Sequence, residues 1–214
     1  MIPTPISDPI SDPREALRML MEGNARFVAS NPEHPNQDAG RRAALAPAQR
    51  PFAVLFGCSD SRLAAEIIFD QGLGDLFVVR TAGHVTGAEA LGSIEYGVSV
   101  LECPLVVVLG HDSCGAVAAA LDSLEQGQLP GGFVRDVVER VTPSVLSAKA
   151  AGIEDRDAIV DVHIRQTVDL LVERSQALAS KVAEGKVAVV GLSYRLLDGQ
   201  ARQVAAHGPV DGAA

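Results

Sequence analysis

The chain has 214 residues, of which 47% are hydrophobic, and a formal net charge of −9 at pH 7. This length and apolar content suffice for one α/β domain with a sizeable core, while the acidic balance argues against a nucleic-acid partner, because like charges repel phosphate backbones. The first twenty residues, MIPTPISDPISDPREALRML, lack the basic end and apolar stretch of a signal peptide, and no apolar run is long enough to span a bilayer, so we expect a cytoplasmic protein with no membrane partner.

The first ordered element that the sequence predicts is a helix that begins after Asp12. Residues 1–11 are rich in proline and polar side chains and show no periodicity, which predicts a flexible N-terminal arm. Asp12 followed by Pro13 is typical of a helix cap and a first helical position, and apolar residues then recur at helical spacing as far as Val28. The prolines and arginines of segment 31–50 indicate an irregular connection with room for one short helix.

Four later runs have the character of strands buried on both faces, because they are continuously apolar and rich in β-branched and aromatic residues. They cover residues 52–58, 76–83, 104–111 and 186–194. Stretches with helical periodicity separate them, at 88–101, 114–127 and 158–183. Alternating strands and helices indicate a parallel sheet covered by helices.

The C-terminal part carries a different signal. The dipeptide Asp198-Gly199 after the fourth strand is typical of a tight turn, which predicts an antiparallel edge strand. The expected fold class is therefore α/β, a mainly parallel sheet of four strands plus an antiparallel C-terminal edge strand, flanked by helices. We expect one domain over residues 12–205 and a tail over 206–214.

The three cysteines are an odd number, which is not typical of a disulfide framework. Cys58 ends the first strand, in FGCSDSR, while His111 and Cys114 follow the third, in GHDSCG. The carboxyl ends of parallel strands meet at one edge of a sheet, so these side chains would converge if the two strands are neighbours. Two sulfurs and one nitrogen suit zinc, and three protein ligands leave a fourth position for chemistry. Cys103, just before a proline, is more simply a buried core residue.

Asp60 and Arg62 alternate with Cys58, so all three side chains would point one way if this segment is extended. An Asp–Arg pair keeps the carboxylate ionised and oriented. Asp60 could then accept a hydrogen bond from water or hydroxide on zinc, or it could itself be the fourth zinc ligand in a closed form. These two arrangements exclude each other. Two thiolates offset the charge of the metal, which predicts a reaction favoured by alkaline pH.

The motifs CSDSR and HDSCG together make the chain similar to bacterial β-class carbonic anhydrases with the plant-type active site. The resemblance extends from the segment EGNARFV (22–28) to the C-terminal strand. It implies reversible hydration of CO2 to bicarbonate and a proton by zinc-bound hydroxide, with one zinc ion per chain. It also implies a homodimer, or a dimer of such dimers. The residues implied are Cys58, His111 and Cys114 as zinc ligands and Asp60 and Arg62 as the catalytic dyad.

The resemblance further implies a set of substrate-binding residues, which are Gln49, Phe77, Ala82, Tyr96 and Gly115. Gln49 would orient the substrate, and Ala82 would line the pocket. Phe77 and Tyr96 would wall the CO2 pocket from across a dimer interface, although by physical reasoning alone both would be assigned to the core. The backbone N–H of Gly115, at the start of a helix, would donate to a bicarbonate oxygen.

Three other functions compete with this reading. A related zinc hydrolase acting on CS2 or COS would have the same ligands. A non-enzymatic structural zinc protein would need four protein ligands, whereas the sequence offers three strong ones plus Asp60. A thiol-redox protein is disfavoured, because Cys-x-x-Cys is absent and Cys58 and Cys114 are 56 residues apart.

Overall fold

The computed structural model describes residues 10–210, which form a five-stranded sheet in the order β2-β1-β3-β4-β5. The strands are β1 (Ala53–Cys58), β2 (Leu76–Thr81), β3 (Leu105–His111), β4 (Ala188–Tyr194) and β5 (Ala201–His207). The first four are parallel, and β5 pairs antiparallel with β4. The predicted fold class is therefore confirmed, including the antiparallel C-terminal edge.

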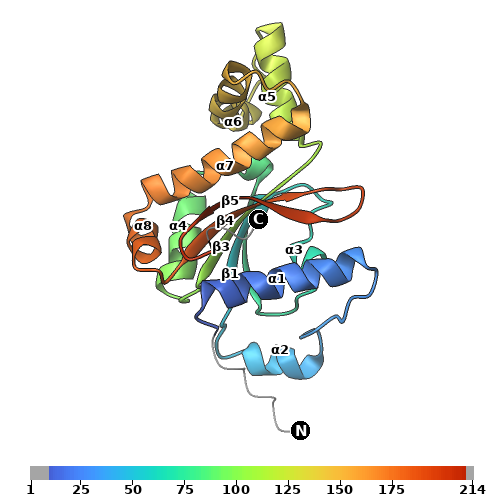
Figure 1. Ribbon diagram of the computed structural model, residues 1–214, viewed down its shortest axis with the longest axis vertical. Helices are drawn as coiled ribbons and strands as arrows, with labels where there is room; N and C mark the ends of the chain where they lie inside the picture. Colours follow the sequence, from blue (N-terminus) through green and yellow to red (C-terminus); the bar gives the residue numbers. More distant parts are fainter. Residues whose placement is uncertain (1–9, 211–214) are drawn as a thin grey trace.

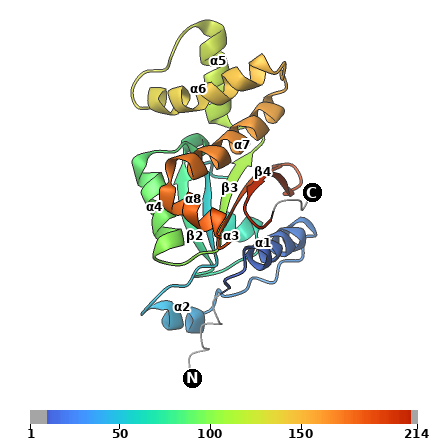
Figure 2. The ribbon, with the colours of Figure 1, turned by 60° about the vertical axis from the view of Figure 1, so that its left-hand side comes forward.

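Helices cover both faces of the sheet (Figure 1). They are α1 (Pro13–Val28), α2 (Ala39–Leu45), α3 (Ala65–Ile68), α4 (Ala88–Ser99), α5 (Gly115–Gln126), α6 (Val134–Ala150), α7 (Arg156–Arg174) and α8 (Gln176–Ala183), with a 3-10 turn, η1 (Ala82–His84). On one face α4 packs on β1 and β2 and α7 packs on β3 to β5, while α1 and α3 pack together on the opposite face. Helices α5 and α6 pack against each other and project beyond the sheet (Figure 2). No helix within residues 10–210 is long and apolar enough to cross a bilayer.

The core lies around the two central strands. Every residue of β1 and β3 is buried, as expected for continuous apolar runs in a sheet covered on both sides. In contrast, β2 forms one edge of the sheet, and five of its six residues are only half-buried. The sheet therefore combines a fully enclosed centre with a partly open edge at β2.

Helix α1 is tied to the rest of the molecule by one buried amide. Asn24 is 2% exposed, and its Nδ2 donates to the carbonyl oxygens of Ile68 at 3.1 Å and Gly199 at 2.8 Å. Its Oδ1 accepts from the backbone N–H of Ala201 at 2.9 Å. Both N–H donors and the carbonyl oxygen are used, so the amide is buried without an unsatisfied group. The predicted N-cap is also confirmed, since the Asp12 carboxylate accepts from the N–H of Arg14.

The C-terminal turn has the predicted chemistry. Gly199 has φ +75°, the left-handed region that glycine adopts without steric cost, and its N–H donates to the carbonyl oxygen of Arg195. The predicted arm over residues 1–11 lies outside the described residues except for its last two. Strand β5 continues to His207, two residues into the segment predicted as a tail.

Two helices differ from the sequence-based expectation. Helix α6 has no counterpart among the predicted elements, because Pro143 lies inside it and interrupts the usual helix signal. The segment 158–183, expected as one helix, is divided at Ser175 into α7 and α8. Ser175 has an extended ψ of 104°, so it ends the first helix. Its hydroxyl accepts from the N–H of Leu178 and donates to Glu95, and it thereby caps the second helix.

Two helical glycines provide a test of the packing of α1. A Cβ on Gly23 would collide with the carbonyl oxygen of Phe69, whereas a Cβ on Gly92 in α4 would meet no atom within 4 Å. Gly92→Ala should raise the free energy of unfolding by about 0.5–1 kcal/mol, because alanine loses less conformational entropy in a helix. Gly23→Ala should lower it by about 1–3 kcal/mol, because α1 must shift away from Phe69. Urea unfolding measures both, and equal stabilisation by the two variants would contradict the close packing.

Candidate metal centre

The path of the chain through the sheet places the site. From β1 the chain passes to β2 on one side and then to β3 on the other side of β1. In open α/β sheets, ligands bind at the carboxyl ends of the two strands where the direction of winding changes. Cys58 is the last residue of β1 and His111 is the last of β3, while Cys114 is the N-cap of α5. Strands β1 and β3 are therefore neighbours, which is the condition under which the side chains of Cys58, His111 and Cys114 were expected to converge.

The three side chains form one compact group. The Sγ atoms of Cys58 and Cys114 and a ring nitrogen of His111 all lie within 4.8 Å of one another, and all three residues are buried. Tetrahedral zinc with Zn–S of about 2.3 Å and Zn–N of about 2.0 Å requires ligand atoms about 3.5–4 Å apart. The group therefore has the size and the donor types of a zinc site.

The imidazole of His111 has the tautomer that a metal requires. Its Nδ1 lies 2.7 Å from the carbonyl oxygen of Asp112, which can only accept, so Nδ1 carries the proton and Nε2 keeps its lone pair. Nε2 is buried and finds no hydrogen-bond partner within the described part of the chain. A buried nitrogen with a free lone pair, facing two sulfurs, fits a bound cation.

The two thiols are electrostatically unequal. The neighbouring Cys114 thiol, together with the N–H of Gly83 at 3.3 Å from the sulfur, lowers the pKa of Cys58 to about 4. The proximity of Cys58 and burial raise the pKa of Cys114. Cys58 is thus the more acidic thiol of the pair, and binding of a metal ion to both sulfurs would release the proton of Cys114 as well.

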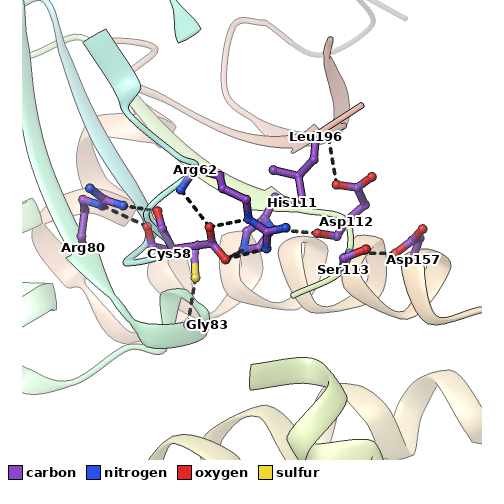
Figure 3. A network of polar contacts seen from close by, with 10 residues as sticks. Cys58, Arg62, Arg80, Gly83, His111, Asp112, Ser113, Asp157 and Leu196 are labelled. Carbon is purple, nitrogen blue, oxygen red and sulfur yellow. Dashed lines mark hydrogen bonds and ion pairs between the residues drawn. The ribbon is translucent and has the colours of Figure 1, made fainter. Parts of the chain in front are cut away.

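Asp60 and Arg62 form the pair that the sequence suggested, although by a different local geometry. The chain turns after β1, with the N–H of Leu63 bonded to the carbonyl oxygen of Asp60 at 3.0 Å, so the segment is not extended. The Asp60 carboxylate instead accepts from Nε and Nη2 of Arg62 at 2.9 and 2.7 Å and from the Arg62 backbone N–H at 2.9 Å (Figure 3). These bonds hold the pKa of Asp60 well below its usual range. Its Oδ2 lies 3.9 Å from Nε2 of His111.

Arg80 is a residue that the sequence analysis did not single out. From β2 its Nε donates to the carbonyl oxygen of Cys58 at 3.0 Å, and its Nη2 donates to that of Asp60 at 2.6 Å. Arg80 therefore holds the backbone carbonyl groups on both sides of Ser59, those of the metal ligand Cys58 and of Asp60 (Figure 3). The sequence feature that could have indicated this role is an arginine near the end of a mostly apolar strand.

The loop that carries the other two ligands is anchored by two aspartates. Asp112 accepts from the N–H of Leu196 at 2.9 Å, which ties the loop to the turn after β4. Asp157 of α7 accepts from the N–H of Ser113 at 3.0 Å. Ser113 has φ +53°, an unusual value for a residue other than glycine, and the two anchors hold the loop in this shape (Figure 3).

Two of the expected substrate-binding residues lie beside the ligands. Gly115 is the first residue of α5, directly after Cys114, and a Cβ there would meet no atom within 4 Å. Ala82 begins η1, the turn whose Gly83 donates to Cys58. The open space at Gly115 lies at a helix N-terminus, where backbone N–H groups favour an anion.

The other three lie at the opposite end of the strands. Gln49 precedes β1, whereas the metal ligand Cys58 ends it. Phe77 is in register with Val54, four residues before Cys58 and thus about 13 Å away along the strand. The rings of Phe77 and Tyr96 are 5.9 Å apart, and Tyr96 is 44% exposed. A single chain does not bring these three side chains to its own metal ligands.

Comparisons with known proteins show which proteins this chain is similar to. A family model described as carbonic anhydrase matches residues 53–201. Carbonic anhydrase 2 of Mycobacterium tuberculosis is 58% identical over 193 residues, which cover 90% of this chain and 93% of that protein. A carbonic anhydrase of Mycolicibacterium smegmatis is 58% identical over 192 residues, with the same two shares. The crystal structure of the β-carbonic anhydrase CafA of Aspergillus fumigatus has a TM-score of 0.69 and 27% identity, covering 90% of this chain and 91% of that one.

The three cysteines supply a test of the metal centre with an internal control. Cys103 is fully buried, its thiol donates to the carbonyl oxygen of Pro51 at 3.2 Å, and burial raises its pKa to about 12. Cys103→Ser should retain one zinc ion per chain after dialysis, as the wild type should. Cys58→Ser and Cys114→Ser should each lose most of it, because a hydroxyl is a poor zinc ligand at neutral pH. Elemental analysis decides, and a full zinc content in Cys58→Ser would contradict the ligand set.

A second prediction concerns pH. His84 is fully buried, neither ring nitrogen has a partner within the described residues, and its ring lies tilted against that of His163 with the centroids 4.4 Å apart. Burial, and then the nearby His163 and His111, lower the pKa of His84. The unfolded chain takes up a proton near pH 6.5 and the native chain does not, so the free energy of unfolding falls as pH drops below about 6.5.

The slope should reach about 1.4 kcal/mol per pH unit for each such histidine. His84→Leu removes one of these groups, so its stability should depend less steeply on pH between 7 and 5, even if its stability at pH 7 is lower. Urea unfolding at several pH values measures the two slopes. Equal slopes in wild type and variant would show that His84 is protonated in the native state.

Proposed function

Because the chain belongs to the β-class carbonic anhydrase family, we propose that it catalyses the reversible hydration of CO2 to bicarbonate and a proton at the Cys58–His111–Cys114 centre. The observation that carries this proposal is the compact, buried group of two sulfurs and an unpartnered imidazole nitrogen, with an ionised carboxylate 3.9 Å away. One zinc ion per chain, when bound there, would supply Lewis acidity that lowers the pKa of a water molecule and so makes it reactive. The three ligands leave the fourth tetrahedral position to the reactants.

Asp60 acts in this proposal as a hydrogen-bond acceptor that selects and orients the reacting oxygen. As an ionised carboxylate it can only accept, so it favours an oxygen that carries a proton and repels an oxyanion. Arg62 keeps it ionised and fixes its orientation through the bidentate contact. Arg62 holds the Asp60 carboxylate outside the compact group of the two sulfurs and the imidazole nitrogen, so this geometry favours the open arrangement over Asp60 as a fourth zinc ligand.

The substrate pocket in this proposal is completed by a second copy of the chain. The partly exposed strand β2 and the exposed ring of Tyr96 offer an apolar edge for that copy. In such a homodimer, Phe77 and Tyr96 would wall the CO2 pocket of the partner, and Gln49, at the same end of the strands, would orient CO2 there. The backbone N–H of Gly115 would donate to a bicarbonate oxygen in its own chain. Two such dimers could pair into a tetramer.

Two further features support an enzyme rather than a structural zinc protein. The metal-binding group within residues 10–210 contains three ligands, whereas a structural zinc site needs four. The ionised Asp60 beside the ligands has no role in a structural site. The three cysteines are free, which fits the cytoplasm that we propose as the place of this activity.

Stopped-flow CO2 hydration with a pH indicator tests the proposal on zinc-loaded protein. The rate should rise from neutral to alkaline pH, because two thiolates offset the metal charge. Asp60→Asn should lower kcat by about 100-fold or more at unchanged zinc content, since its amide can donate as well as accept. Asp122→Asn is the matched control, because Asp122 also pairs with an arginine, Arg156, but on the exposed surface of α5.

The proposal fails if zinc-loaded wild-type protein shows no CO2 hydration at any pH. The role of Asp60 fails separately if Asp60→Asn keeps the wild-type kcat, or if Asp122→Asn loses as much.

A further inference from the structure

A chain of three hydrogen bonds leads from the outer helices to the first metal ligand. The hydroxyl of Ser144 in α6 lies 2.8 Å from Nδ1 of His163 in α7, and Nε2 of His163 lies 2.9 Å from the carbonyl oxygen of Gly83. The N–H of Gly83 in turn donates to Sγ of Cys58 at 3.3 Å. We call this series of hydrogen bonds the Ser144–His163–Gly83 relay. It includes neither His111 and Cys114 nor the Asp60–Arg62 pair.

The direction of every hydrogen bond in the relay is determined by chemistry. The carbonyl oxygen of Gly83 can only accept, so Nε2 of His163 must donate. In a neutral imidazole the other nitrogen is then an acceptor, so the hydroxyl of Ser144 donates to Nδ1. Ser144 and His163 are each 4% exposed, and water therefore offers little competition. Ser144 thus selects one tautomer of His163 and one orientation of its ring.

Gly83 needs such support because glycine can adopt many backbone conformations, so that contacts from other residues must select one. Its φ of +62° lies in the left-handed region, and a Cβ there would lie 2.6 Å from the Cβ of Ala116. His163 holds the peptide group that follows Gly83, while the N–H that meets Cys58 belongs to the peptide group before it. Because peptide groups are planar, only φ and ψ of Gly83 separate the two. Holding one plane therefore limits the directions in which the other N–H can point to rotations about these two bonds.

We propose that His163, oriented by Ser144, is a positioning residue for the metal centre: through Gly83 it directs a backbone N–H at the Cys58 sulfur and so preorganises this ligand for the ion. The inference rests on the proposed function in taking Cys58, His111 and Cys114 as the zinc ligands. A thiolate that accepts an N–H hydrogen bond keeps its orientation and carries less charge than a bare one. The relay would therefore affect both the affinity for the metal and the electronic character of the metal–sulfur bond.

Four variants separate the relay from general packing. His163→Phe keeps a ring of similar size but cannot donate, whereas His163→Gln retains an N–H donor at its Nε2. Ser144→Ala leaves the histidine in place and removes the group that orients it. Thr167→Val is the matched control. Thr167 lies in α7 with His163, is also buried, and lines the same cavity as Ser144 and His163. Its hydroxyl donates only to the carbonyl oxygen of His163.

Two measurements on the full chain are independent of catalysis. Competition against a chelator of known affinity gives the zinc dissociation constant at a fixed pH. Substitution with Co2+ gives the position of the thiolate-to-metal charge-transfer band. We expect His163→Phe to weaken zinc binding about 10–100-fold and to shift the band, because support of a metal ligand from outside the coordination sphere has effects of that size. Ser144→Ala should change both in the same direction but less, while His163→Gln should recover most of the loss and Thr167→Val should match the wild type.

The inference is overturned if folded His163→Phe, checked by circular dichroism, binds zinc as the wild type does with an unshifted band. It is also overturned if Thr167→Val loses as much affinity as Ser144→Ala. Should His163→Phe fail to fold, the comparison of Ser144→Ala with Thr167→Val decides by the same criteria. If the wild-type protein itself binds no zinc, the proposed function fails. If the wild type binds zinc but the affinity does not depend on His163, only this inference fails.

Discussion

The parallel pairing of β1 with β3 is the contact on which the metal centre depends. In the observed register Gly57 lies opposite Leu109, so that Cys58 and His111 leave the sheet at the same edge. A slip of two residues along either strand would preserve which side chains face the core but separate the ligands by about 7 Å. The apolar side chains that bury both strands therefore also determine whether the sulfur and the imidazole meet.

Unusual backbone conformations gather around this edge. Gly83 and His84 have positive φ values after β2, and Ser113 has one between the two ligands that follow β3. Positive φ is costly for a residue other than glycine and persists only where neighbouring contacts enforce it. Here Asp157 of α7 holds Ser113 and His163 of α7 holds Gly83, while Asp112 ties the loop of Ser113 to Leu196. The backbone segments that carry and contact the ligands are thus held in place by hydrogen bonds from other parts of the chain.

The opposite end of the strands has a different character. Near the start of the edge strand β2, the Phe77–Tyr96 pair reaches the surface of the single chain, and β2 itself is half-buried along most of its length. An edge strand with apolar side chains is a natural place for association with a second copy. In the proposed function, assembly and catalysis are consequently coupled, because the metal ligands of one chain and the aromatic wall of the other form one pocket.

The sequence by itself determined the strand positions and the cap at Asp12. It also assigned Cys103 to the core and carried the motifs that predicted a zinc centre at the other two cysteines. Those features depend on local composition and on ligand chemistry, which are readable along the chain. The tertiary structure alone decided that Asp60 meets Arg62 in a turn, that Arg80 clamps the backbone beside it, and that α6 forms around Pro143. It also decided the contact of His163 with Gly83, 80 residues away, since a buried polar group reveals its partner only once packing has brought distant segments together.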